Sequence, residues 1–166
     1  NIIGFFIVAV IALCVGVLFA RRHRQPFPTR LIIIAIALRI LGSFVRYEIL
    51  YRAYDGIGDS VEYYRRGVSF ADRLWGRDLS VLGFSQWFGG EHWWGTDFVG
   101  NISGLVISVI GPTMRGEFLV FSMLGFIGLY LAARGVLDLV PKPLVVRYAA
   151  WIWLWPSLWF WTSGVG

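Results

Sequence analysis

The chain alternates long apolar segments with short polar turns, and the lengths of the apolar segments predict helices that cross a membrane. Residues 2–20 and 148–166 are two runs of 19 residues without a charged side chain. A helix needs about 20 apolar residues to cross the hydrocarbon core of a bilayer. Two further segments are nearly as long and as apolar. We therefore predict four membrane spans, which are residues 2–20, 31–50, 114–133 and 148–163.

The segment between the second and third spans, residues 51–113, is predicted to be a large loop with two helices of its own. Residues 59–75 have an apolar stripe at helical spacing and are expected to lie flat in the membrane interface. The stripe consists of Val61, Tyr64, Val68, Ala71, Leu74 and Trp75. Residues 101–110 are apolar but too short to span. They end at Gly111-Pro112, which is a helix stop, and they form the second interfacial helix.

Charge predicts which side of the membrane each loop faces. The turn at 21–30 contains four arginines and no acid, and the turn at 134–147 contains three basic residues and one acid. The stretch 48–97 instead contains eight acids and five arginines. Positively charged loops stay in the cytoplasm. Both basic turns are therefore expected inside, and the large loop and both termini outside.

The composition agrees with a membrane protein and excludes a nucleic-acid-binding one. Charged residues are 15% of the chain, whereas soluble domains have about 25%. The high isoelectric point, about 9.8, comes from basic residues at the positions that membrane topology requires, so we do not expect a nucleic-acid partner. The chain is thus predicted to be a single all-α, polytopic membrane domain with the lipid bilayer as its first partner.

Candidate chemistry begins at the turn that opens the large loop. Asp55 and Asp59 flank two glycines, and a helix follows with Glu62 and Tyr63 in its first turn. A carboxylate on a turn at the membrane surface can act as a general base. The spacing of Asp59 and Glu62 also matches a capping box, in which both residues only stabilise the start of the helix. Spacing alone leaves both interpretations open.

Two arginines in the second predicted span form another candidate site. Arg39 lies at membrane depth, and Arg46 is on the same helical face, with Ser43 between them. A guanidinium inside a bilayer usually has a partner or a role. The pair is suited to binding a phosphate group, because guanidinium groups bind phosphate oxygens through paired hydrogen bonds. The alternative is that Arg46 extends to the interface and Arg39 pairs with an acid elsewhere.

The segment 91–97 combines acids with His92 and Trp93. One histidine without a second at metal-binding spacing is a weak metal signal, so a divalent metal is compatible with the sequence but not indicated. Aromatic faces and carboxylates also suit a sugar. Interfacial anchoring of the tryptophans explains the same residues.

Several short motifs resemble the C-type (GT-C) glycosyltransferases. Asp59-Ser60-Val61-Glu62-Tyr63 is similar to the Asp-x-x-x-Tyr element that opens the first outer loop in that family. The segment 102–112 resembles the second loop helix. The segment 155–164, with Pro-Ser and Trp-Thr-Ser-Gly, resembles a stretch of many bacterial members. Many members have Asp-Glu where this chain has Asp59-Ser60.

The resemblance implies an enzyme of the bacterial plasma membrane that takes a sugar from a polyprenyl-phosphate carrier on the outer face and requires no cofactor. Asp59 would be the general base, with Asp55 in reserve, and Arg39 and Arg46 would hold the carrier phosphate. Tyr63, Glu62, His92 and Trp93 would contact the substrates. Members usually have eight or more spans, so we expect these residues to be the N-terminal part of a longer protein. The rival hypothesis is a non-catalytic subunit that docks onto other membrane subunits.

Overall fold

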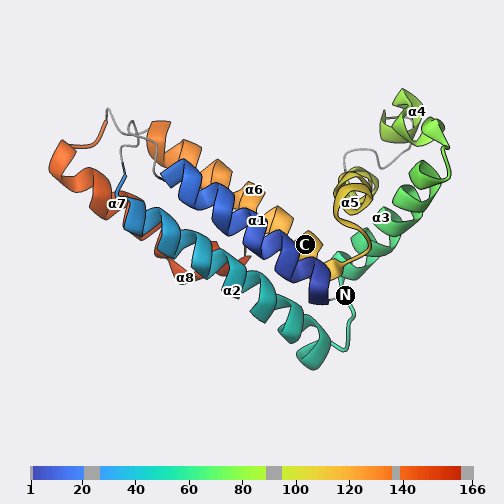
Figure 1. Cartoon of the computed structure of the whole chain (residues 1–166), viewed down its shortest axis with the longest axis horizontal. Coiled ribbons are helices and arrows are strands. Elements are labelled where there is room, and N and C mark those ends of the chain that lie inside the picture. The colour runs from blue at the N-terminus through green and yellow to red at the C-terminus, as the bar shows by residue number, and fades with distance from the viewer. Residues whose placement is uncertain (1, 21–26, 89–94, 136–138, 162–166) are drawn as a thin grey trace.

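The computed structural model describes residues 2–20, 27–88, 95–135 and 139–161, and the ordered elements of these ranges are all helical (Figure 1). The prediction of an all-α fold is therefore confirmed. The α-helices are α1 (Ile2–Ala20), α2 (Thr29–Ala53), α3 (Asp59–Trp75), α4 (Phe84–Phe88), α5 (Thr96–Ile110), α6 (Met114–Gly135), α7 (Val145–Leu154) and α8 (Pro156–Trp161). Two 3-10 helices are η1 (Leu79–Leu82) and η2 (Lys142–Leu144).

The helices form a bundle with a smaller helical hairpin at one end. Helices α1, α2 and α6 lie side by side along the bundle, and α3, α4 and α5 project from the end where α2 stops and α6 starts (Figure 1). The main core lies between α2, α6 and α7. Ile32 and Trp153 are fully buried there, and Phe126 and Tyr130 are nearly so.

The lengths of the first three predicted spans agree with the helices, but the fourth does not. Residues 2–20 coincide with α1, and 31–50 and 114–133 fall inside α2 and α6. The predicted span 148–163 is instead divided at Pro156 into α7 and α8. Proline has no backbone N–H and disfavours helical geometry in the preceding residue. Trp155 accordingly has an extended ψ of 121°.

The surface of the bundle is apolar over much of its length. On α1, the exposed fractions of Phe6, Val10 and Leu18 are 58%, 59% and 70%. Exposed apolar surface of this extent requires lipid or another protein to cover it. Among the described residues, one helix, Met114–Gly135, is long and apolar enough to cross a membrane.

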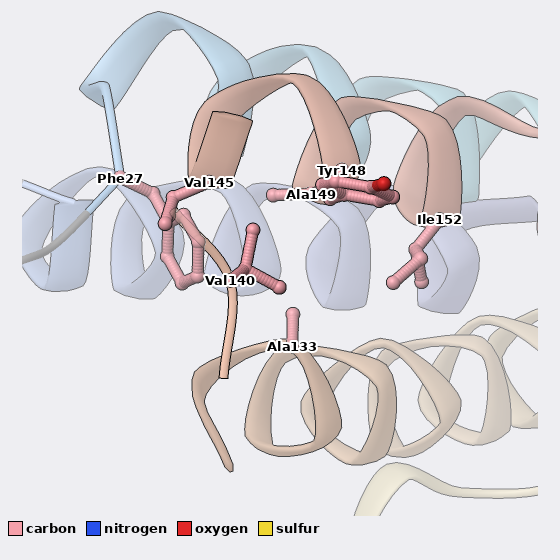
Figure 2. Close-up of a pocket in the computed structure, with 7 residues that line it drawn as sticks. All are labelled: Phe27, Ala133, Val140, Val145, Tyr148, Ala149 and Ile152. Carbon is pink, nitrogen blue, oxygen red and sulfur yellow. The ribbon is translucent and has the colours of Figure 1, made fainter. Parts of the chain in front are cut away.

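The end of α1, the start of α2, the end of α6 and α7 lie at one end of the bundle, and the acidic loop begins at the other (Figure 1). The Phe27 ring at the start of α2 lies 4.7 Å from the Trp153 ring of α7 and 5.6 Å from the Tyr130 ring of α6. Figure 2 shows Phe27 close to side chains from the end of α6 and from α7. The space between them is only about 10 Å³, so this junction is filled rather than a ligand cavity.

The α3–α5 crossing is the tightest contact in the hairpin, and it depends on glycine. A Cβ added to Gly104 of α5 would lie 2.5 Å from the Phe70 ring, and one added to Gly67 of α3 would lie 2.9 Å from Ser103 Cβ. Small residues allow two helix backbones to approach closely. Figure 1 shows α5 nearly end-on while α3 runs across the view, so the two helices cross at this point.

The predicted apolar stripe of residues 59–75 is not the side of α3 that packs on α5. The helix itself has the predicted bounds, but its most buried positions are Ser60, Gly67, Phe70 and Ala71. Of the predicted stripe only Ala71 is buried, and Trp75 is 47% exposed. Helical periodicity finds the side of α3 that carries large apolar side chains. The side that packs on α5 is a different one, because small residues there let the two helices approach closely. The predicted helix 101–110 is also longer than expected, since α5 begins at Thr96.

Helix α1 reaches this region through its first turn. A Cβ added to Gly4 would lie 2.8 Å from the Thr113 side chain, which is buried between α5 and α6. Thr113 Oγ1 also accepts a hydrogen bond from the Gly116 N–H at 3.3 Å. The start of α6 is therefore bound closely to α1.

Replacing Gly104 with alanine is expected to destabilise the protein by about 1–3 kcal/mol, because the new methyl group overpacks the α3–α5 crossing. Thermal unfolding in detergent, followed by circular dichroism, measures the effect. Gly128→Ala is the matched control, since nothing lies within 4 Å of a Cβ at Gly128. Equal melting temperatures for the two variants would contradict the proposed role of the crossing.

Candidate functional site

The candidate site lies at the end of the bundle, where the chain turns from α2 into α3. Gly56 has a φ of 70°, a left-handed conformation that favours glycine, and Asp55 has a φ of 50°. A Cβ at Gly56 would also lie 3.0 Å from the Tyr51 ring. The turn is closed by a 2.9 Å hydrogen bond from Gly56 N–H to the Leu50 carbonyl. It leaves Asp55 and Asp59 exposed to the surroundings.

Asp59 is the first residue of α3 and does not cap it. The N-cap is Gly58, and no side chain makes a cap hydrogen bond. Glu62 instead accepts a 2.8 Å hydrogen bond from Arg66 Nε, and this bond raises the pKa of Arg66. The capping-box interpretation of Asp59 and Glu62 is therefore wrong. Tyr63, four residues after Asp59, is partly buried on the same side of α3.

A small polar pocket opens beside this turn. Its volume is about 210 Å³, and its walls are Tyr47 and Tyr51 of α2, Tyr64 of α3, and Met114 and Arg115 of α6. Tyr51 belongs both to this pocket and to the Asp55–Asp59 turn, because its ring packs on Gly56. Its hydroxyl donates to Met114 Sδ at 3.4 Å.

Arg115 is held in a fixed orientation in the pocket. Its Nη2 donates to Glu48 Oε1 at 2.7 Å, and its guanidinium lies 4.3 Å from the centre of the Tyr47 ring. Its Nε is buried and has no hydrogen-bond partner among the described residues. The pocket thus combines aromatic faces, hydroxyl groups and one carboxylate–guanidinium pair.

Glu117 is a buried acid close to this pocket that the sequence analysis missed. Its side chain is 1% exposed, and neither carboxylate oxygen has a hydrogen-bond partner in the described part of the chain. The Ser103 hydroxyl of α5 is buried close to this carboxylate, although the two groups make no hydrogen bond of normal geometry in this conformation. Burial and the nearby Glu117 together raise the pKa of Tyr64. The available signal was an acid two residues after Arg115, at the start of a predicted span that has no other charged residue up to residue 133, and such an acid marks a functional candidate.

The remaining candidates lie apart from the pocket or outside the described residues. Arg39 is 0% exposed, and its backbone carbonyl accepts a hydrogen bond from Ser122 Oγ at 3.4 Å. Its guanidinium therefore offers no donor to a ligand at the protein surface in this conformation. Arg46, on the same face, is partly buried. His92 and Trp93 lie outside the described residues.

The described residues contain no group of three or more His, Cys, Asp or Glu side chains that could hold a metal ion. The pocket offers hydrogen-bonding groups and aromatic surface from the consecutive helices α2 and α3 and from α6, which is distant from them in sequence. No family model, curated protein or solved structure matches this chain. The assignment of function therefore depends on the geometry of the site itself.

The carboxylates of Glu117 and Glu48 are expected to respond oppositely to replacement by glutamine. Glu117→Gln should keep or raise the melting temperature, because a carboxylate that is buried beside a single hydroxyl group opposes folding. Glu48→Gln should lower it, since Arg115 loses its charged partner. Thermal unfolding of both variants in the same detergent is the measurement. A large loss of stability in Glu117→Gln alone would show that the charge of Glu117 is required.

Proposed function

We propose that this protein is a membrane glycosyltransferase that moves a sugar from a polyprenyl-phosphate carrier to an acceptor hydroxyl at the outer face of a bacterial plasma membrane. The observation that carries the proposal is the exposed carboxylate of Asp59, which opens α3 beside a pocket of sugar-compatible chemistry. The resemblance of the segment 59–63 to the first-loop element of the C-type glycosyltransferases supports the same reaction.

The proposed topology has four crossings, by α1, α2, α6 and the pair α7–α8. The charges support this arrangement, because the start of α2, the end of α6 and α7 carry basic residues and lie at one end of the bundle, and the acidic loop starts at the other (Figure 1). The positive-inside rule then assigns the basic end to the cytoplasm. The large loop and both ends of the described chain would lie outside.

The pocket is proposed to hold the sugar. Tyrosine faces pack on the C–H surfaces of a sugar ring, and their hydroxyls exchange hydrogen bonds with those of the sugar. Glu48 also accepts a hydrogen bond from Arg52, so these three side chains together carry one net positive charge beside the pocket. Tyr64 follows Asp59 by five residues, about 7.5 Å along a helix, so α3 connects the pocket to the base.

The proposed reaction is an inverting substitution at the anomeric carbon. Asp59 accepts the proton of the acceptor hydroxyl while the acceptor oxygen forms the new glycosidic bond. The bond from the anomeric carbon to the carrier phosphate breaks, and the phosphate leaves with the electron pair. Arg46 is the guanidinium proposed to stabilise that charge, since Arg39 is fully covered. Asp55 remains the reserve base.

Asp59→Asn is expected to lower sugar transfer by at least about 100-fold, the usual contribution of a general base. The assay reconstitutes the full chain in vesicles, supplies a radiolabelled polyprenyl-phosphate hexose, and follows label into a membrane-lipid acceptor extract. Asp55→Asn is the matched control and should retain most activity. Full transfer by a folded Asp59→Asn variant would exclude Asp59 as the base. No transfer by the unmodified protein with any hexose or pentose donor would contradict the proposed reaction.

A further inference from the structure

A second hollow lies along the bundle, away from the Asp59 turn. It is a groove of about 400 Å³ between α1 and α6, with α2 at its floor. Gly16 of α1 and Ile36 of α2 form one side, and Phe126 and Ile127 of α6 form the other. The size is within the range of small-molecule sites, about 300–1,000 Å³.

The groove is elongated in the direction of the helices. Its α6 wall runs from Met123 to Arg134, which at 1.5 Å per residue is about 16 Å. Its lining is apolar along this length, and the absence of a side chain at Gly16 lets Ile36 of α2 pack directly against α1 beside the groove. A narrow apolar groove parallel to a membrane span fits an extended hydrocarbon chain rather than a compact ligand.

A positive charge closes one end of the groove. Arg134, in the last turn of α6, is part of the lining and is exposed. Arg30 in the first turn of α2, Lys142 in η2 and Arg147 in α7 are also exposed, and the start of α2 and α7 lie at the same end of the bundle as the end of α6 (Figure 1). An apolar channel that ends at a guanidinium is complementary to a molecule with one hydrocarbon chain and an anionic head. Basic residues at a membrane surface attract anionic lipids in the same way.

We propose that this groove binds an acyl chain of an anionic glycerophospholipid, with the head-group phosphate at Arg134. The site is at the opposite end of the bundle from Asp59 and is independent of the proposed sugar transfer. If the basic end is cytoplasmic, the bound lipid belongs to the inner leaflet. The two other molecules that could cover the groove are a neutral lipid and a second copy of this chain, and the test below separates them from an anionic lipid.

The test is native mass spectrometry of the full chain in detergent, equilibrated with equal amounts of phosphatidylglycerol and phosphatidylcholine that have the same acyl chains. The unmodified protein should retain phosphatidylglycerol over phosphatidylcholine by about fivefold, the effect of one cation near an anionic head group. The Arg134→Gln variant should retain phosphatidylglycerol and phosphatidylcholine in nearly equal amounts. Arg147→Gln removes the same charge outside the groove lining and should leave the preference unchanged.

A second pair of variants tests the apolar part of the groove. Ala12→Phe places a ring inside the groove and should lower the occupancy of both lipids. Val10→Phe adds the same ring at an exposed position of α1 that does not line the groove, and it should leave the occupancy of both lipids unchanged. Equal loss of preference in Arg134→Gln and Arg147→Gln would overturn the proposal, because surface charge in general would then explain it. A lipid-free dimer that Ala12→Phe abolishes would also overturn it, in favour of a second copy.

Discussion

The close crossing of α3 and α5 determines where the rest of the loop can lie. A Cβ added to Gly67 would lie 3.0 Å from the backbone nitrogen of Gly104, so there is no room for a side chain between the two backbones. Because the two helices pack this closely, α3 moves together with α5. Helix α5 in turn leads into α6 within three residues, through Gly111 and Thr113. The Asp59 turn therefore takes its position from a bundle helix. The Arg66 ion pairs with Glu62 and Asp97 are about half exposed and contribute little beside this packing.

The sequence predicts the helices of this fold better than the contacts between them. Apolar length and the stops at Pro28 and Gly111-Pro112 are local signals, and they placed α1, α2 and α6 within a few residues, while the apolar stripe placed α3. The buried side of α3 was not predicted, because an apolar stripe cannot distinguish a surface that faces lipid from one that faces protein. The break at Pro156 was visible in the sequence, yet the charge-free run around it suggested one continuous span.

One part of the candidate site could also be predicted from the sequence, and the other part could not. The exposed turn with Asp55 and Asp59 could be recognised from its glycines and acids, which are neighbours in sequence. The pocket could not, because Tyr47, Tyr64 and Arg115 come from three helices and meet only in the folded chain. Arg39 was the more conspicuous arginine in the sequence, since it interrupts an apolar run. Its complete burial makes it part of the bundle interior, whereas Arg115 is the arginine that reaches a pocket.

The contact of Gly4 with Thr113 has a mechanical consequence for α1. One half of this helix is held against the start of α6 at Gly4, and the other half is held against α2 at Gly16, where an added Cβ would clash with Ile36 Cδ1. A helix that is fixed at two points along its length accommodates a change of bilayer thickness together with the helices it contacts. In a thinner or thicker membrane, α1, α2 and the start of α6 would therefore tilt as one unit, and the width of the groove would stay constant.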